Sequence, residues 1–241
     1  MKIALIGYGK MGKAIEAIAQ QKSHEIVARI KSADFKAEDL NGADVAIEFT
    51  VPEAAAKNIM ICFDANIPVV VGTTAWYHDF NAIKDRAIAE NQSLFTATNF
   101  SIGVNILFHI NKQLASTMNS FEEYEVSMNE THHIHKKDHP SGTAVTLAEG
   151  IIDSLDRKKN YVGQLKGEQA DSSSFDLHIT SSRENEVPGF HEISYKSEID
   201  EIKLSHNAFN RQGFAKGAVI AAEWLYGKKG VFGMNDLLNL K

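Results

Sequence analysis

The feature that most constrains the fold is the run Gly7-Tyr8-Gly9-Lys10-Met11-Gly12 near the start of the sequence. A short apolar run at residues 2–6 precedes it, and apolar residues at helical spacing, among them Ile15 and Ala19, follow it. The order is therefore a strand, a glycine-rich turn and a helix, which is the context that the dinucleotide-binding pattern GxGxxG requires. The alternative is a glycine-rich turn in another kind of α/β protein.

Each glycine of this run has its own physical role in such a turn. Gly7 permits the tight turn, Gly9 lets the backbone approach a pyrophosphate, and Gly12 lets the helix pack closely on the strand. The phosphates would lie at the N-terminus of the helix, where free N–H groups and the helix dipole favour negative charge. We therefore expect residues 7–12 to bind the phosphates of a dinucleotide.

Strands and helices then alternate with short links. Apolar runs at residues 25–30, 44–50, 67–71 and 93–97 predict strands, and amphipathic stretches at 52–63 and 77–90 predict helices. This alternation predicts a Rossmann-like, doubly wound parallel sheet, whose ligands bind at the carboxyl ends of the strands. Four loops lie at such ends, and we expect them to form one dinucleotide crevice: residues 7–12, Lys31, residues 72–74 and residues 97–100.

The end of the second predicted strand bears on the choice of cofactor. In NAD-binding domains a carboxylate at this point holds the ribose 2′-hydroxyl. Here the strand ends at Lys31-Ser32, and the nearest acid is Asp34. A cation and a hydroxyl suit the 2′-phosphate of NADP better, which favours NADPH over NADH. The alternative is that Lys31 is a solvated surface lysine.

The pattern changes after residue 101. Residues 102–118 predict a long helix, 122–129 a strand, 143–155 a helix and 214–226 a closing helix. The charged, serine-containing stretch 158–174 predicts a surface loop, and residues 175–182, 192–196 and 201–206 predict strands. A run of strands with few helices predicts a second, α+β domain with a mixed or antiparallel sheet.

The stretch from Glu130 to Thr143 concentrates chemically active residues. It holds four of the ten histidines, two lysines and the turn Pro-Ser-Gly-Thr before a predicted helix. The N–H groups and hydroxyls at residues 141–143 predict a cradle for an anion, with a carboxylate as the natural guest. Lys136 could supply a proton or hold a second carboxylate, and His132 and His133 could act as acid or orienting donor.

Two other interpretations of this stretch remain. A metal site could use His132, His133, His135 and His139, but their spacing matches no familiar zinc pattern and the nearby lysines oppose a cation, so we expect no metal. Alternatively the histidines are polar surface groups, which we expect for His135 and His139. Six further histidines are scattered and are assigned no role: His24, His78, His109, His178, His191 and His206.

The bulk properties exclude some classes of protein. The net charge of −6 argues against a nucleic-acid binder, which would normally have a basic face. The single cysteine, Cys62, excludes an intrachain disulfide and lies in an apolar helical pattern, so we expect a packed thiol. There is no run of 18 apolar residues and no signal-peptide pattern, and we therefore expect a cytoplasmic protein without membrane contacts.

The motifs, taken together, resemble those of the 4-hydroxy-tetrahydrodipicolinate reductase (dihydrodipicolinate reductase) family. The most specific is Glu130-x-His132-His133-x-x-Lys136-x-Asp138-x-Pro140-Ser141-Gly142-Thr143-Ala144. Others follow in family order: Gly7-x-Gly9-x-Met11-Gly12, Phe49-Thr50-x-Pro52, Gly72-Thr73-Thr74, Asn99-Phe100-Ser101-x-Gly103-Val104-Asn105 and Phe214-Ala215-x-Gly217-Ala218. The resemblance covers nearly the whole chain.

This resemblance implies an NAD(P)H-dependent reductase of the diaminopimelate and lysine pathway that acts on a small dicarboxylate. It implies a dinucleotide-binding domain at 1–102 and 212–241, a substrate-binding and oligomerisation domain at 103–211, and a homotetramer. His132 would transfer a proton, Lys136 would be a second donor, and His133, Ser141, Gly142 and Thr143 would bind substrate. With Lys31, the cofactor contacts would be Gly7, Tyr8, Gly9, Lys10, Met11, Gly12, Gly72, Thr73, Thr74, Ala97, Thr98, Asn99 and Phe100.

Three features depart from the family pattern. His139 stands where a small residue is usual, Lys31-Ser32 stands where an acid is common, and the segment between the second and third strands is short. Two other functions stay open at this point. One is a two-domain Rossmann dehydrogenase for another small anion. The other is a non-catalytic dinucleotide sensor, which would not need a proton donor beside a carboxylate cradle.

Overall fold

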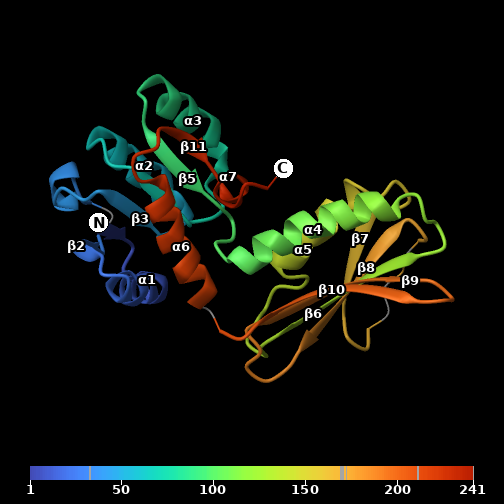
Figure 1. The fold of residues 1–241 in the computed structure, drawn as a ribbon. Helices are drawn as coiled ribbons and strands as arrows, with labels where there is room; N and C mark the ends of the chain where they lie inside the picture. Colours follow the sequence, from blue (N-terminus) through green and yellow to red (C-terminus); the bar gives the residue numbers. More distant parts are fainter. Residues whose placement is uncertain (33, 169–170, 172, 211, 241) are drawn as a thin grey trace. The chain divides into compact units, whose positions relative to one another are not determined.

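The computed structural model describes residues 1–32, 34–168, 171, 173–210 and 212–240 (Figure 1). The chain divides into two compact units, Met1–Ile102 with Gln212–Lys241, and Gly103–Arg211. Among the described residues, no helix is both long and apolar enough to cross a membrane. Each unit has its own sheet and its own hydrophobic core.

The first unit is built on a six-stranded sheet in the order β11-β5-β4-β3-β1-β2. All its paired strands run parallel. The strands are β1 (Lys2–Ile6), β2 (Glu25–Ile30), β3 (Val45–Glu48), β4 (Val69–Val71), β5 (Ser93–Thr96) and β11 (Gly230–Phe232). A parallel sheet of this order with crossover helices is Rossmann-like, as the alternating pattern predicted.

Helices cover both faces of this sheet, because successive strand residues point to opposite sides and both sides are apolar. In β1, Ala4 and Ile6 pack on one face, whereas Ile3 and Leu5 pack on the other. The first face is covered by α2 (Pro52–Asp64) and α3 (Phe80–Ala89), with the 3-10 turns η1 (Ala37–Leu40) and η2 (Tyr77–Asp79) nearby in the chain. The second is covered by α1 (Lys10–Gln21), α6 (Gln212–Leu225) and α7 (Met234–Leu238) (Figure 1).

The second unit is built on a five-stranded mixed sheet in the order β10-β9-β6-β8-β7. Its strands are β6 (Glu125–His132), β7 (Asn160–Leu165), β8 (Asp176–Arg183), β9 (Gly189–Lys196) and β10 (Glu201–Ala208). The pairs β10–β9 and β9–β6 are antiparallel, whereas β6–β8 and β8–β7 are parallel. The α+β domain with a mixed sheet is therefore confirmed.

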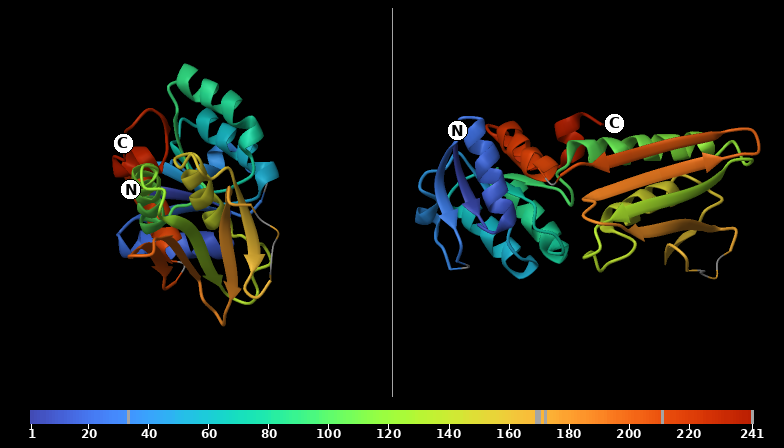
Figure 2. Two further views of the ribbon diagram at one scale, coloured as in Figure 1. Left: turned by 90° about the vertical axis from the view of Figure 1, so that its right-hand side faces the viewer. Right: turned by 90° about the horizontal axis from the view of Figure 1, so that it is seen from below.

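Only one face of this second sheet is apolar. Buried and exposed residues alternate along β6, with Val126 and Met128 on the buried face and Ser127 and Asn129 on the exposed face. The helices α4 (Ile102–Met118) and α5 (Gly142–Ile152) supply the other half of this core (Figure 2). The opposite face of the sheet is polar and has no helix packed on it within the described part of the unit.

One segment differs from the sequence prediction. Residues 158–174 were expected to form a surface loop, but residues 160–165 form the edge strand β7. An edge strand pairs on one side only, so it tolerates polar residues such as Asn160 and Gln164 that hide the strand pattern. Parts of the predicted loop at 169, 170 and 172 lie outside the described residues. Position 163 of β7 requires glycine, because the Cβ of any other residue would lie 2.4 Å from the ring of Pro140.

The C-terminal region also differs. Residues 214–226 were expected to close the fold, but β11 and α7 follow and extend the parallel sheet beyond β5. β11 has three residues and α7 has five, which is too short for periodicity to reveal. In the second unit, β9 begins at Gly189 rather than at the predicted residue 192, because Gly189 still pairs with Ala208 of β10.

Candidate active site

The glycine-rich turn has the geometry that its sequence predicted. Gly7 has φ +93°, and an added Cβ would lie 1.9 Å from the carbonyl oxygen of Phe49. At Gly12 an added Cβ would lie 2.3 Å from the carbonyl oxygen of Gly7. At Gly9, by contrast, no heavy atom of the described residues lies within 4 Å of an added Cβ. Gly7 and Gly12 are therefore required by packing, whereas Gly9 leaves space for something outside the chain.

The space beside Gly9 is a cavity at the start of α1. The N-cap residue of this helix is Gly9, which has no side chain to accept a hydrogen bond from the first turn. The first N–H groups of α1 therefore have no partner within the helix. The cavity has a volume of about 370 Å³ and is lined by residues of the glycine turn and of two neighbouring strand ends: Gly9, Lys10, Met11, Phe49, Thr50, Pro52, Gly72, Thr73 and Thr74. These features fit the pyrophosphate of a dinucleotide.

The loop after β4 is fixed from both sides. An added Cβ at Gly72 would lie 2.1 Å from the ring of Phe49, so only glycine fits there. Thr50 donates its N–H to the hydroxyl oxygen of Thr73 at 2.7 Å, and the indole N–H of Trp76 donates to the carbonyl oxygen of Thr73 at 2.9 Å. Thr73 is therefore buried and held, whereas Thr74 is exposed at the edge of the sheet.

The loop after β5 presents a mixed set of residues. Thr98 is exposed and Ala97 and Asn99 are half-buried, but Phe100 is only 2% exposed. The ring of Phe100 packs against those of Phe49 and Phe95, with centroid distances of 5.6 and 5.9 Å. The Phe100 side chain therefore belongs to the core, and any ligand contact from this residue is limited to its backbone.

The end of β2 carries two exposed cations, Arg29 and Lys31. Lys31 and Ser32 are exposed and line a second cavity of about 380 Å³ with Asp34. The ammonium of Lys31 lies 5.4 Å from the centroid of the Tyr8 ring, a cation–π distance. The neighbouring Arg29 is paired with Glu16, which also accepts a hydrogen bond from Tyr8. Within the described part of the chain, Lys31 is thus the cation of this strand end that is not paired with an acid.

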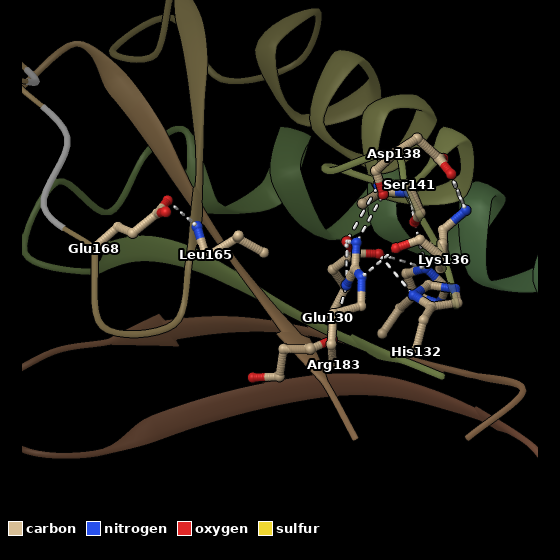
Figure 3. A network of polar contacts seen from close by, with 11 residues as sticks. Glu130, His132, Lys136, Asp138, Ser141, Leu165, Glu168 and Arg183 are labelled. Atoms are coloured by element: carbon tan, nitrogen blue, oxygen red, sulfur yellow. Dashed lines mark hydrogen bonds and ion pairs between the residues drawn. The ribbon is translucent and has the colours of Figure 1, made fainter. Parts of the chain in front are cut away.

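In the second unit, the site is organised around the end of β6 (Figure 3). Glu130 and His132 are separated by two positions and so lie on the same, buried face of the strand. Register places His191 of β9 directly opposite Glu130, and Arg183 of β8 directly opposite His132. Four polar side chains from three adjacent strands therefore meet at the edge of the apolar core.

Glu130 is a completely buried carboxylate in contact with all of these groups. Its Oε2 lies 2.9 Å from Nδ1 of His132 and 3.9 Å from Nε2 of His191. Its Oε1 accepts from the Ser141 N–H at 3.2 Å and from the two terminal nitrogens of Arg183 at 3.4 Å. Burial alone would raise the pKa of Glu130, but the neighbouring His132 and Ser141 groups hold this pKa well below its usual range.

Ser141 and His191 form hydrogen bonds that fix the start of α5 on its buried side. Ser141 is the N-cap of α5, and its hydroxyl oxygen accepts the N–H of Ala144 at 3.2 Å. The same hydroxyl lies 3.0 Å from Nε2 of His191. Burial lowers the pKa of His191 to about 4, so at neutral pH its uncharged ring can accept the Ser141 proton. The hydroxyl of Ser141 is therefore engaged within the protein, and the expected contact of Ser141 with substrate stays a prediction.

Gly142 and Thr143 form the open end of α5. An added Cβ at Gly142 would find open space, since none of the described heavy atoms comes within 4 Å. Gly142 is exposed and Thr143 half-buried, and both belong to the first turn, where N–H groups have no helical partner. The helix end next to Glu130 is therefore open, and the anion site expected from the Pro-Ser-Gly-Thr turn stays a prediction.

Lys136 lies in the loop between β6 and α5 and is paired with Asp138. Its ammonium lies 2.9 and 2.7 Å from the two carboxylate oxygens of Asp138, and this contact lowers the pKa of Asp138 (Figure 3). Arg183 fixes the same loop by donating to the carbonyl oxygens of Lys136 at 3.2 Å and Asp138 at 2.7 Å. Arg183 therefore connects Glu130 to the loop that carries Lys136.

The histidines of the stretch divide into different environments. His132 is buried and His133 half-buried, whereas His135 and His139 are exposed, as expected of polar surface groups. The four do not form a metal cluster among the described residues. The group whose geometry could hold an ion is Glu130, His132 and His191. Arg183, which lies 3.4 Å from Glu130, opposes a cation there.

Three residues of this site were not identified from the sequence. These are His191, Arg183 and Glu130, whose contact with His132 was not foreseen. His191 and Arg183 enter through strand pairing, which a single sequence does not reveal. For Glu130 a signal did exist, because its spacing of two from His132 within a predicted strand places both side chains on one face.

Family models, curated relatives and a solved structure all relate this chain to dihydrodipicolinate reductases. The family model described as "Dihydrodipicolinate reductase, N-terminus" matches residues 1–100, and "Dihydrodipicolinate reductase, C-terminus" matches residues 103–238. A 4-hydroxy-tetrahydrodipicolinate reductase of Christiangramia forsetii is 45% identical over 241 residues, which cover 99% of this chain and 98% of the relative. One of Methanospirillum hungatei is 32% identical over 258 residues, which cover 100% and 99%.

A solved structure shares the fold. The dipicolinate-bound dihydrodipicolinate reductase from Paenisporosarcina sp. TG-14 aligns with a TM-score of 0.79 at 22% identity, over 98% of both chains. The parallel sheet, its glycine turn and the His-Lys site define the class, a two-domain oxidoreductase that uses a nicotinamide dinucleotide. Within this class, the chain belongs to the dihydrodipicolinate reductase family. The resemblance seen in the sequence motifs is thereby confirmed.

Proposed function

We propose that the chain converts 4-hydroxy-tetrahydrodipicolinate to tetrahydrodipicolinate with NAD(P)H and a proton, releasing NAD(P)⁺ and the 4-hydroxyl group as water, as a step of diaminopimelate and lysine biosynthesis. The observation that carries this proposal is the contact of a single carboxylate, Glu130, with both His132 and the Ser141 N–H at the start of α5. A proton-transfer ring thus lies beside an open helix end that suits a carboxylate. The names of the full-length relatives supply the substrate.

The residues of the second unit would bind and protonate the substrate. The N–H groups of Gly142 and Thr143 would hold one carboxylate, with Ser141 supporting them from below. His133 would contact the substrate beside them. His132 would deliver a proton from Nε2 to the carbon framework, while Lys136, released from Asp138, would either protonate the 4-hydroxyl group as it leaves as water or hold the second carboxylate. Reduction of an electron-poor C=C or C=N bond needs such a proton at the atom next to the one that accepts hydride.

The first unit would hold the cofactor, which supplies the hydride when bound. The N–H groups at Gly9, Lys10 and Met11 would bind its pyrophosphate. Thr73 and Thr74, with the backbone of residues 97–100, would position the nicotinamide end. Lys31 and Ser32 would meet the 2′-phosphate of NADPH, which we therefore propose as the preferred cofactor. Hydride transfer requires both ligands to be bound at once.

We also propose that the protein is a cytoplasmic homotetramer assembled through the second unit. The support is the polar, helix-free face of the mixed sheet, which is available for pairing with other copies. Its polarity favours hydrogen-bonded rather than purely apolar contacts. Sedimentation equilibrium on the full chain measures the assembly, and a monomer at micromolar concentration would contradict this part of the proposal.

The reaction is tested by NADPH oxidation in an assay coupled to dihydrodipicolinate synthase, which makes the unstable substrate in place. We expect oxidation that depends on the synthase reaction and on this chain. NADPH binding without oxidation in the coupled assay would favour the dinucleotide sensor instead. Oxidation with other small anionic substrates, but not with this one, would favour a different dehydrogenase.

A further inference from the structure

We infer that Glu130 is a positioning residue for the reaction, which sets the orientation and tautomer of His132 and connects that ring to the start of α5. The inference rests on the proposed role of His132 in proton transfer. It assigns a function to a carboxylate that is buried away from solvent.

The carboxylate is held so that one oxygen faces His132. Oε1 is fixed by the Ser141 N–H and by Arg183, as Figure 3 shows. Oε2 is left to lie 2.9 Å from Nδ1 of His132. Three anchoring contacts on one oxygen thus aim the other at the imidazole ring.

The negative charge of this carboxylate oxygen, 2.9 Å from Nδ1, favours the His132 tautomer with a proton on that nitrogen. The other nitrogen, Nε2, is then the atom that exchanges a proton with substrate. This nitrogen lies beneath Gly189, where an added Cβ would be only 3.1 Å away. The absence of a side chain at Gly189 leaves Nε2 uncovered from that direction.

The second buried histidine does not compete for this role. Nε2 of His191 lies 3.9 Å from Glu130 but 3.0 Å from the Ser141 hydroxyl. The rings of His132 and His191 pack edge to face, with centroids 5.1 Å apart. Glu130 therefore lies closer to His132 than to His191, and His132 is the ring that it can orient.

A purely structural explanation is weaker. A buried charge costs desolvation energy, and replacing buried ion pairs by apolar groups is often neutral or stabilising. The other face positions of β6 towards the core, Val126 and Met128, are apolar. A carboxylate at residue 130 therefore has no clear advantage for stability over an apolar residue, and two of the groups that it contacts, His132 and the start of α5, are those proposed to act on the substrate.

The test compares Glu130→Gln in two backgrounds, the native chain and His132→Gln. Because proton transfer contributes about 10²–10⁴-fold, we expect Glu130→Gln alone to lower kcat by about 10²-fold. In the His132→Gln background the same change should lower kcat by less than about threefold, because the ring that Glu130 positions is already absent. Affinity for NADPH, measured by tryptophan fluorescence, should not change in either background.

The control is Glu186→Gln, which removes an exposed carboxylate of the same unit that pairs with the exposed His135. We expect native kcat in this variant. If Glu130→Gln does not fold, Glu130→Asp takes its place, since it keeps a charge beside Arg183 but withdraws the carboxylate from His132 by one methylene. It too should lose kcat in the native background only.

Each result separates the inference from the proposed function. Native kcat in Glu130→Gln, together with a loss in His132→Gln, would overturn the inference alone. Equal losses in both backgrounds would show a structural role and would also overturn it. Native kcat in His132→Gln would overturn the proposed role of His132 and the inference with it. No NADPH oxidation by the native chain would overturn the proposed function.

Discussion

Gly189 and His132 lie against each other across adjacent strands, and a Cβ added at Gly189 would be 3.1 Å from Nε2 of His132 and 3.5 Å from Cδ2. Gly189 has no left-handed backbone that would require glycine. Its small size therefore matters for the neighbouring ring rather than for the turn. This contact gives a direct way to disturb the working nitrogen of His132 without changing any charge.

We expect Gly189→Ala to lower kcat by about tenfold to 10²-fold, because a misplacement of a reacting group by about 1 Å can cost 10²-fold. The new methyl group would cover Nε2 or push the ring away from Glu130. Steady-state kinetics in the coupled assay measure the loss, with thermal unfolding to confirm folding. The control is Ala208→Gly, which changes the residue paired with Gly189 on β10 by one methyl group. Gly167→Ala is not suitable, because Gly167 has φ +97°, where alanine would be strained. Unchanged kcat in Gly189→Ala would show that Nε2 is not the reacting atom.

Alanine substitutions at two glycines of the glycine-rich turn should have different effects. Gly9→Ala should fold normally but raise the KM for NADPH by about tenfold or more, because its methyl group enters the space proposed for the pyrophosphate and weakens charged hydrogen bonds. Gly12→Ala should instead lower the free energy of unfolding by about 1–3 kcal/mol through the clash with Gly7. Chemical denaturation and cofactor titration separate the two effects. Similar stability and KM changes in both variants would contradict this division.

Lys31→Glu should reverse the charge at the end of β2 and shift preference from NADPH towards NADH. We expect the ratio of kcat/KM for the two cofactors to change by about tenfold, the value of one charged hydrogen bond. Lys36→Glu, which changes another exposed lysine of the following segment, is the matched control. An unchanged ratio in Lys31→Glu would show that Lys31 is a surface residue without a role in cofactor choice.

Lys136→Ala and His132→Gln should each lower kcat by about 10²–10⁴-fold while NADPH still binds, since both act after the cofactor is bound. Lys137→Ala changes an exposed lysine next to the site and should keep native kcat. Turnover is measured in the coupled assay and binding by fluorescence. Native turnover in either site variant would remove that residue from the proposed mechanism.

His191 should make the stability of the protein depend on pH. Burial lowers its pKa from 6.5 to about 4, so the unfolded chain binds a proton between these values that the folded chain does not. Stability from this group is therefore complete above pH 6.5 and falls by up to about 3 kcal/mol as the pH drops to 4. Denaturant unfolding of the native chain and His191→Gln across this range tests it. Equal slopes against pH in the two proteins would contradict the prediction.

Glu130 contributes to stability in a different pH window. Its pKa is held below the usual 4.5, so its stabilising contribution is present above pH 4.5 and is lost as the pH falls further. Between pH 6.5 and 4.5 this carboxylate therefore does not contribute to the pH dependence that is ascribed to His191. The pKa of His206 is also lowered by burial, and the comparison with His191→Gln isolates the part due to His191.

Much of the first unit could be predicted from the sequence because its signals are local. The glycine turn, the buried β-rich runs and the amphipathic helices each extend over only a few residues, and parallel crossover rules then fix the sheet. The prediction missed β11 and α7 because such short elements are specified by docking on β5 rather than by periodicity. It missed β7 because an edge strand needs little apolar sequence.

The sequence by itself determined the family, the loops at the strand ends and the chemical character of the stretch from 130 to 143, since these depend on residue types at fixed spacing. Only the tertiary structure decided which of those groups work together. It placed His191 opposite Glu130 and Arg183 opposite His132, through pairing of strands that are far apart in the chain. It also showed that Ser141 contacts His191 on the buried side of the helix end, while Gly142 faces open space. The physical reason is that strand register, which sets which side chains share a face, depends on the whole sheet and its core.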